Sequence, residues 1–72
     1  MIQKDAVKKA QSLLQSRIHA GGKFPEDEWV AIAPDWDVNL FSEQGKPKAS
    51  LYPVEDGCTD PFGEIEISLP EA

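Results

Sequence analysis

The sequence predicts an α+β fold in which one N-terminal amphipathic helix packs on an antiparallel meander of three or four strands. Two observations favour this fold. Apolar residues recur at spacings of three and four near the N-terminus, whereas the later part of the chain alternates between apolar and polar residues. The length of 72 residues suits one small domain, so we expect residues 1–72 to fold as a single unit.

The first predicted element is a helix over about residues 3–20. We expect Asp5 to cap its N-terminus, with Ile2 as an alternative start one turn earlier, and Gly21-Gly22 to end it. The polar face opposite the apolar stripe is mildly basic. The stripe itself consists of Ala6, Val7, Ala10, Leu13, Leu14 and Ile18.

Four later segments have the composition of strands. Turn-forming residues at 42–47 and 55–61 separate the last three of them. Pro53 lacks a donor for the ladder, which predicts that its strand lies at a sheet edge or ends there. Pro70 is expected to end the last strand. The predicted strands cover about residues 29–33, 36–41, 48–54 and 64–69.

The segment at residues 25–33 has two interpretations. Pro25 followed by three acidic residues is typical of the start of a helix. The sequence from Trp29 to Ala33 has the β-branched and aromatic composition of a strand. We favour the strand.

Charge is divided unevenly along the chain. Before Phe24 there are five basic residues and one acidic residue, which gives a net charge of +4; the rest has two basic and twelve acidic residues, which gives −10. The total of −6 argues against direct binding to nucleic acid or to an anionic membrane, because both need a positive contact surface. We therefore expect a partner protein with a basic surface.

The single cysteine indicates a reducing compartment. Cys58 cannot form an internal disulfide, whereas a secreted domain of this size usually has several. No apolar run has the length of a signal peptide or of a membrane span. We expect a cytoplasmic protein without a membrane anchor.

Short motifs for metal or phosphoryl chemistry fail at identifiable positions. Asp35, Asp37 and Asn39 match the first ligands of a calcium loop. However, Leu40 replaces the turn glycine and Lys46 replaces the bidentate glutamate. The apolar run before Asp35 and Asp37 also resembles the first motif of haloacid-dehalogenase-type phosphotransferases, whose doubly wound sheet needs a longer chain. We expect no metal and no cofactor.

Cys58 is also a weak candidate for a nucleophile. A catalytic thiol needs a base within reach, and the only histidine, His19, falls on the polar face of the predicted helix. Asp56 and Asp60 surround the thiol with negative charge instead. We therefore expect no enzymatic activity.

The candidate binding surface is an acidic sheet face that bears aromatic side chains. Phe41 and Tyr52 have the strand parity opposite to that of Leu40 and Leu51, so they should emerge on the face that the helix leaves uncovered. Aromatic residues inside a polar rim are typical of binding hot spots. The predicted partner-binding residues are Trp29, Asp35, Asp37, Phe41, Tyr52, Asp56 and Asp60.

Arg17 falls inside the apolar stripe of the predicted helix. A buried charge needs a partner, and Asp35 or Asp37 could provide the carboxylate for a structural ion pair. Alternatively, the side chain extends along its methylene groups and keeps its charge in water.

The leading functional hypothesis is a small acidic, non-enzymatic protein-binding domain. One alternative is an inhibitor or immunity-type protein that blocks a basic nucleic-acid-handling partner by charge mimicry. Phage or plasmid counter-defence proteins, immunity proteins and antitoxins resemble this chain in size and charge, which is an analogy at the level of the class. A second alternative is a homodimer with a structural role. The acidic residues would then serve only to keep the protein soluble.

Overall fold

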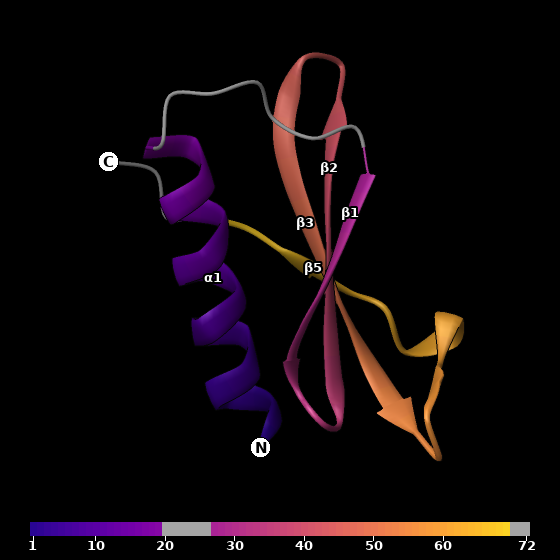
Figure 1. Ribbon diagram of the computed structural model, residues 1–72. Helices are drawn as coiled ribbons and strands as arrows, with labels where there is room; N and C mark the ends of the chain where they lie inside the picture. Colours follow the sequence, from indigo (N-terminus) through magenta and orange to yellow (C-terminus); the bar gives the residue numbers. More distant parts are fainter. Residues whose placement is uncertain (20–26, 70–72) are drawn as a thin grey trace.

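The computed structural model describes residues 1–19 and 27–69 and confirms the α+β fold (Figure 1). The elements are α1 (Gln3–His19), β1 (Asp27–Ala33), β2 (Trp36–Glu43), β3 (Lys46–Glu55), β4 (Cys58–Thr59), the 3₁₀ helix η1 (Pro61–Gly63) and β5 (Ile65–Ile67). The strands β1, β2 and β3 pair antiparallel in chain order, and β4 and β5 both pair with β3.

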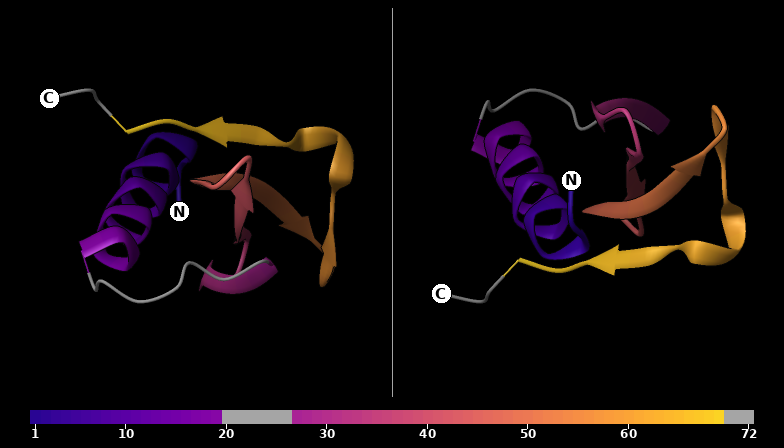
Figure 2. Two further views of the ribbon diagram at one scale, coloured as in Figure 1. Left: turned by 90° about the horizontal axis from the view of Figure 1, so that it is seen from above. Right: turned by 90° about the horizontal axis from the view of Figure 1, so that it is seen from below.

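The sheet has the helix on one side only. Viewed from above and from below, α1 lies between β1 and β5, whereas β4 and η1 stand on the opposite side of β3 (Figure 2). The sheet therefore has one face covered by the helix and one face that the helix leaves open. We call the second one the open face.

The core lies between α1 and the covered face. Ala6, Ala10 and Leu14 follow one another at intervals of four residues and are all buried. They pack against strand residues that are cross-strand neighbours of one another. The small side chains of the two alanines allow the helix to approach the sheet closely. Each fully buried leucine or valine stabilises the fold by roughly 1.5–3 kcal/mol. The buried strand residues are Val38, Leu40, Ala49, Leu51 and Ile67.

The helix begins earlier than a cap at Asp5 would allow. The amide of Ala6 donates to the carbonyl of Ile2 at 3.0 Å, so the first turn starts at Gln3 and contains Asp5. The prediction of Asp5 as the cap was wrong, and the alternative start near Ile2 was correct. The predicted end at Gly21-Gly22 lies outside the described residues.

Two tight hairpins set the register of the sheet. Gln44 and Gly45 connect β2 to β3, and Asp56 and Gly57 connect β3 to β4; all four residues have positive φ. Positive φ at both central positions defines the type I′ turn, whose twist matches that of the paired strands. The sequence predicted only turns in these two regions, so β4 and η1 were not foreseen.

The strand interpretation of residues 27–33 is confirmed, while residues 25–26 and Pro70 lie outside the described residues. The last strand, Ile65–Ile67, is shorter than predicted, and beyond it the carbonyl of Ser68 accepts from the side-chain amide of Gln11 of α1 at 2.9 Å. The prediction that Pro53 marks an edge or an end was wrong. Pro53 lies where the outer side of β3 changes partner from β5 to β4, and its carbonyl accepts from the amide of Asp60 at 2.9 Å.

Candidate functional site

The open face is built from alternate residues of the three long strands. In the register of the sheet, Trp29 lies beside Asn39, and Asn39 lies beside Ser50. The next row contains Ala31, Asp37 and Tyr52, because successive side chains on one face are two residues apart. The covered face takes the intervening apolar residues.

Trp29 and Tyr52 form an aromatic pair on this face. Their ring centroids are 5.2 Å apart and the rings are tilted by 44°. Trp29 belongs to β1 and Tyr52 to β3, and β2 lies between these two strands. The backbones of β1 and β3 are therefore about 10 Å apart. The rings therefore extend toward each other across β2, and Trp29 is still 52% exposed.

Two polar side chains are buried on the open face, in the same row as Trp29. Asn39 is 9% exposed and Ser50 is 2% exposed. Asn39 donates through Nδ2 to Oδ1 of Asp27 at 2.7 Å, and Ser50 donates through Oγ to Oε1 of Glu64 at 2.9 Å. Each buried group thus has a carboxylate partner, as buried polar groups require.

The alternation pattern gave no sign of these two buried residues. A polar residue at an alternate strand position predicts contact with water, and Asn39 fits that pattern. Its burial depends on the register that brings Trp29 beside it and on the ring of Tyr52 from β3. A single sequence contains neither piece of information.

Tyr52 has a perturbed phenol. Its partly buried position raises the pKa above the ordinary value of 10.0, and the negative charge of Glu64 together with a hydrogen bond to that carboxylate raises it further. A hydrogen bond with Ser50 acts in the opposite direction. The raised pKa means that the phenol keeps its proton to a higher pH than an ordinary tyrosine does.

The β4–η1 segment, residues 58–63, is fixed against the open face. Thr59 donates through Oγ1 to Oδ2 of Asp37 at 3.1 Å, although β3 lies between their strands. Asp60 caps η1 by accepting from the amide of Phe62 at 2.9 Å. Gly63 approaches Pro53 so closely that a Cβ atom there would lie 2.6 Å from the ring of the proline.

Phe62 is the most exposed large apolar side chain of the described residues. It is 97% exposed, on the short helix that Asp60 caps. It was not among the predicted site residues. The sequence feature that could have indicated its exposure is its position between Pro61 and Gly63, in a stretch without the alternation of apolar and polar residues that is typical of a strand.

The structure brings four of the seven predicted residues together on the open face. Trp29, Asp37, Phe41 and Tyr52 all have the open-face parity. Two others lie at the border of the face, where Asp56 is in the β3–β4 turn and Asp60 caps η1. Both are exposed.

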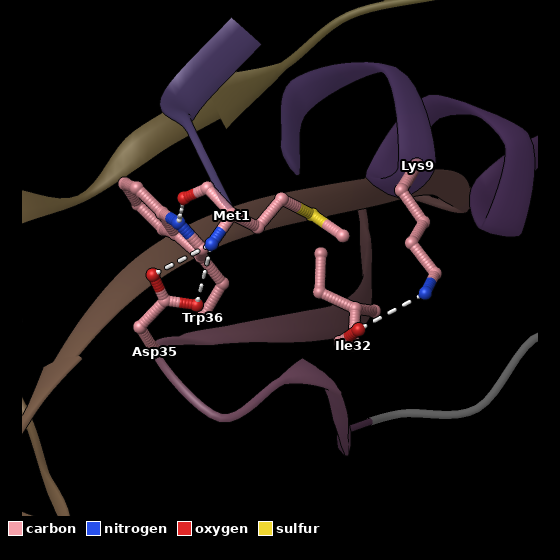
Figure 3. A network of polar contacts seen from close by, with 5 residues as sticks. All are labelled: Met1, Lys9, Ile32, Asp35 and Trp36. Atoms are coloured by element: carbon pink, nitrogen blue, oxygen red, sulfur yellow. Dashed lines mark hydrogen bonds and ion pairs between the residues drawn. The ribbon is translucent and has the colours of Figure 1, made fainter. Parts of the chain in front are cut away.

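Asp35 does not belong to this surface. Figure 3 shows its carboxylate facing the N-terminal ammonium group of Met1, with the closer oxygen at 3.1 Å. The indole of Trp36 donates to the carbonyl of Met1 at 2.7 Å, and Lys9 donates to the carbonyl of Ile32 at 3.0 Å. Asp35 therefore joins the chain end to the β1–β2 turn, and it is not among the predicted residues that share the open face.

Arg17 forms an ion pair, but with neither predicted partner. Its Nη2 atom lies 3.1 Å from Oε1 of Glu28, on β1. The expected pairing with Asp35 or Asp37 was wrong, because Asp35 binds Met1 and Asp37 lies on the open face, whereas Glu28 has the parity of the covered face. Arg17 is exposed, so the pair lies at the surface beside the helix.

Among residues 1–19 and 27–69 we find no pocket and no group of three or more potential metal ligands. The partial calcium-loop residues separate, because Asp35, Asp37 and Asn39 take different partners. None of the described helices is long and apolar enough to cross a membrane. Comparisons with protein-family models, curated proteins and solved structures found no match.

Proposed function

We propose that this protein is a non-enzymatic binding domain that docks a partner protein on its open face. The observation that supports this most is the Trp29–Tyr52 pair, which presents a half-exposed indole braced by a second ring. An aromatic side chain that is already positioned loses little conformational entropy on binding. Large aromatic side chains of this kind are enriched among the residues that dominate binding energy.

The charge around the pair favours a basic partner. The carboxylates of Asp27, Asp37 and Glu64 are held by hydrogen bonds from Asn39, Thr59 and Ser50. Fixed carboxylates around an aromatic centre complement lysine and arginine side chains around an apolar recess. We therefore assign the partner a basic surface with an apolar centre.

Binding experiments with paired variants test this proposal. Wild-type protein with a C-terminal affinity tag, which leaves the Met1 ammonium free, would retrieve partners from lysate at low and at high salt. The dissociation constant of each identified partner would then be measured by calorimetry with Trp29→Ala and Asp37→Asn. The matched controls are Ile2→Ala and Asp5→Asn, which alter an exposed apolar residue and an exposed carboxylate near the start of α1.

We expect Trp29→Ala to weaken binding at least tenfold, because it removes the central ring. Asp37→Asn should weaken binding a few-fold and make it less dependent on salt, because it removes one charge but keeps an acceptor for Thr59. Both controls should bind as the wild type does. A partner that binds the two open-face variants with unchanged affinity would rule out this face as the binding site.

A narrower version of the proposal is inhibition of a nucleic-acid-handling partner by charge mimicry. The fixed carboxylates on the open face and the exposed Asp56 and Asp60 at its border favour it, because immobilised negative charges can occupy sites that bind phosphates. In this version double-stranded DNA or RNA would compete with the protein for the same partner. A partner retained in excess nucleic acid would contradict the mimicry and leave the general proposal intact.

We place this function in the cytoplasm. Cys58 is the single cysteine of the chain and its thiol is exposed, which suits a reducing compartment. Separation of cell fractions followed by detection of the native protein tests this placement, and recovery from a secreted or membrane fraction would contradict it.

A further inference from the structure

The outer edge of β1 has no partner strand among the described residues. β1 is the end strand of the sheet and pairs only with β2. An edge strand of seven residues presents a row of backbone donors and acceptors that can pair with another strand. The register of the hairpins shows which of these groups face outward.

In the tight β2–β3 hairpin, the residues that flank the turn exchange two backbone hydrogen bonds. Glu43 and Lys46 form this pair, so the odd-numbered residues of β2 bond to β3 and the even-numbered ones bond to β1. Val38 and Leu40 therefore bond to Val30 and Glu28 of β1. The N–H and C=O groups of Asp27, Trp29 and Ala31 consequently point away from the sheet.

We propose that β1 pairs antiparallel with β1 of a second copy, in a register centred on Trp29. This register uses all three outward-facing residues, because Trp29 pairs with Trp29 of the second copy and Asp27 pairs with Ala31 in both directions. Six backbone hydrogen bonds form between the copies. The two indoles become direct cross-strand neighbours on the open face, where aromatic pairs are favourable.

The arrangement of charge selects this register over its neighbours. Centred on Trp29, it places each acidic residue of β1 opposite an uncharged one, since Glu28 faces Val30. A register centred on Glu28 would place the two Glu28 carboxylates opposite each other. A register centred on Val30 would pair Asp27 with Ala33. That pairing would extend across the β-bulge between Ala31 and Ala33, where the ladder is irregular and the carbonyl of Ile32 already accepts from Lys9.

Each copy has a net charge of −6, so the copies repel each other at long range. Screening by salt should therefore strengthen self-association, whereas it weakens binding to a basic partner. This opposite response separates the inference from the proposed function. One can fail while the other holds.

Sedimentation equilibrium of the full chain tests the inference. The wild type should change from the 7.9 kDa monomer to twice that mass as its concentration rises, with a lower dissociation constant in 0.5 M than in about 0.05 M salt. Ala31→Pro removes an outward N–H but no bond to β2, and it should weaken the dimer at least tenfold. Circular dichroism would verify that this variant remains folded.

A pair of charge variants tests the register itself. Ala31→Glu places a carboxylate opposite Asp27 twice per dimer and should weaken association about fivefold, whereas Ala31→Lys should strengthen it about fivefold. Gln15→Glu and Gln15→Lys make the same changes of net charge on the exposed helix surface and should have much smaller effects. A monomer at every concentration in high salt would overturn the inference. So would a dimer that responds equally to changes at residues 15 and 31.

Discussion

Trp29 and Tyr52 contact each other across an intervening strand, and Asn39 and Ser50, which share the cross-strand row of Trp29, are almost closed to water. In that row Asn39 is bound to Asp27 and Ser50 to Glu64. The open face thus has a thin packed layer of its own, in addition to the core beneath α1. The residues proposed for binding therefore also contribute to stability.

Loss of the half-buried indole of Trp29 should destabilise the protein, whereas loss of the almost fully exposed ring of Phe62 should not. Trp29→Ala removes the half-buried part of the indole and its contact with Tyr52, and we expect a loss of roughly 1–2 kcal/mol in the free energy of unfolding. Phe62→Ala, at a ring that is 97% exposed, should change it by less than about 0.5 kcal/mol. Urea denaturation followed by circular dichroism measures both. Equal effects would show that Trp29 makes no stabilising contact.

Titration of the phenol provides a second check on the same layer. Tyr52 is the only tyrosine, so the phenolate absorbance of the folded protein reports this residue alone. The midpoint should lie above pH 10.0, mainly because of burial and then because of Glu64. Glu64→Gln should lower the midpoint partway toward the ordinary value and leave the effect of burial. A midpoint at the value found in urea would contradict this environment.

The same shift predicts how stability depends on pH. Because the folded-state pKa is raised, the unfolded chain loses its phenol proton first as the pH rises. The stabilisation is fully present below about pH 10, the unfolded-state value, and is lost as the pH rises through the folded-state value. Tyr52→Phe should therefore show a shallower loss of stability in this window, measured by urea denaturation at several pH values.

The elements with strong local signals were predicted well. The apolar spacing of α1 and the alternation in β2 and β3 each follow from the position of residues along one segment. What could not be predicted depends on which segments lie side by side. Asp35 pairs with Met1, and Arg17 pairs with Glu28. Pro53 lies between the residues of β3 that pair with β5 and those that pair with β4. These pairings join residues that no local pattern connects.

The ion pair at the chain end should respond to changes at either partner. Asp35→Asn removes the attraction to the Met1 ammonium, and we expect a loss of about 0.5 kcal/mol because the pair is partly exposed. Acetylation of the amino group should cost a similar amount and add nothing further in the Asp35→Asn variant. Thermal unfolding of the four proteins in low salt measures this coupling. Additive losses would show that the two groups do not interact.

Two glycines should differ in how they tolerate alanine. Gly63→Ala places a methyl group against the ring of Pro53, and we expect a loss of about 1–3 kcal/mol from the forced shift of η1. Gly45→Ala meets no atom within 4 Å but has a φ of +76°, and it should cost about 1 kcal/mol. Chemical denaturation compares the two. A smaller loss at Gly63 than at Gly45 would contradict the contact with Pro53.

The position of Pro53 has a consequence for how this chain can vary. β3 and β5 pair antiparallel, and β4 and η1 lie between them in the chain. Residues 56–64 therefore amount to an insertion into a β3–β5 hairpin. Because Pro53 has no N–H to offer, the ladder is already interrupted where the insertion leaves β3. The exposed side chains of this segment, Asp56 and Phe62, can therefore be exchanged while the helix and the β3–β5 ladder stay in place. Thr59, Gly63 and Glu64 must be kept, because they contact Asp37, Pro53 and Ser50. With those three contacts kept, the segment is a site for grafting a new binding loop.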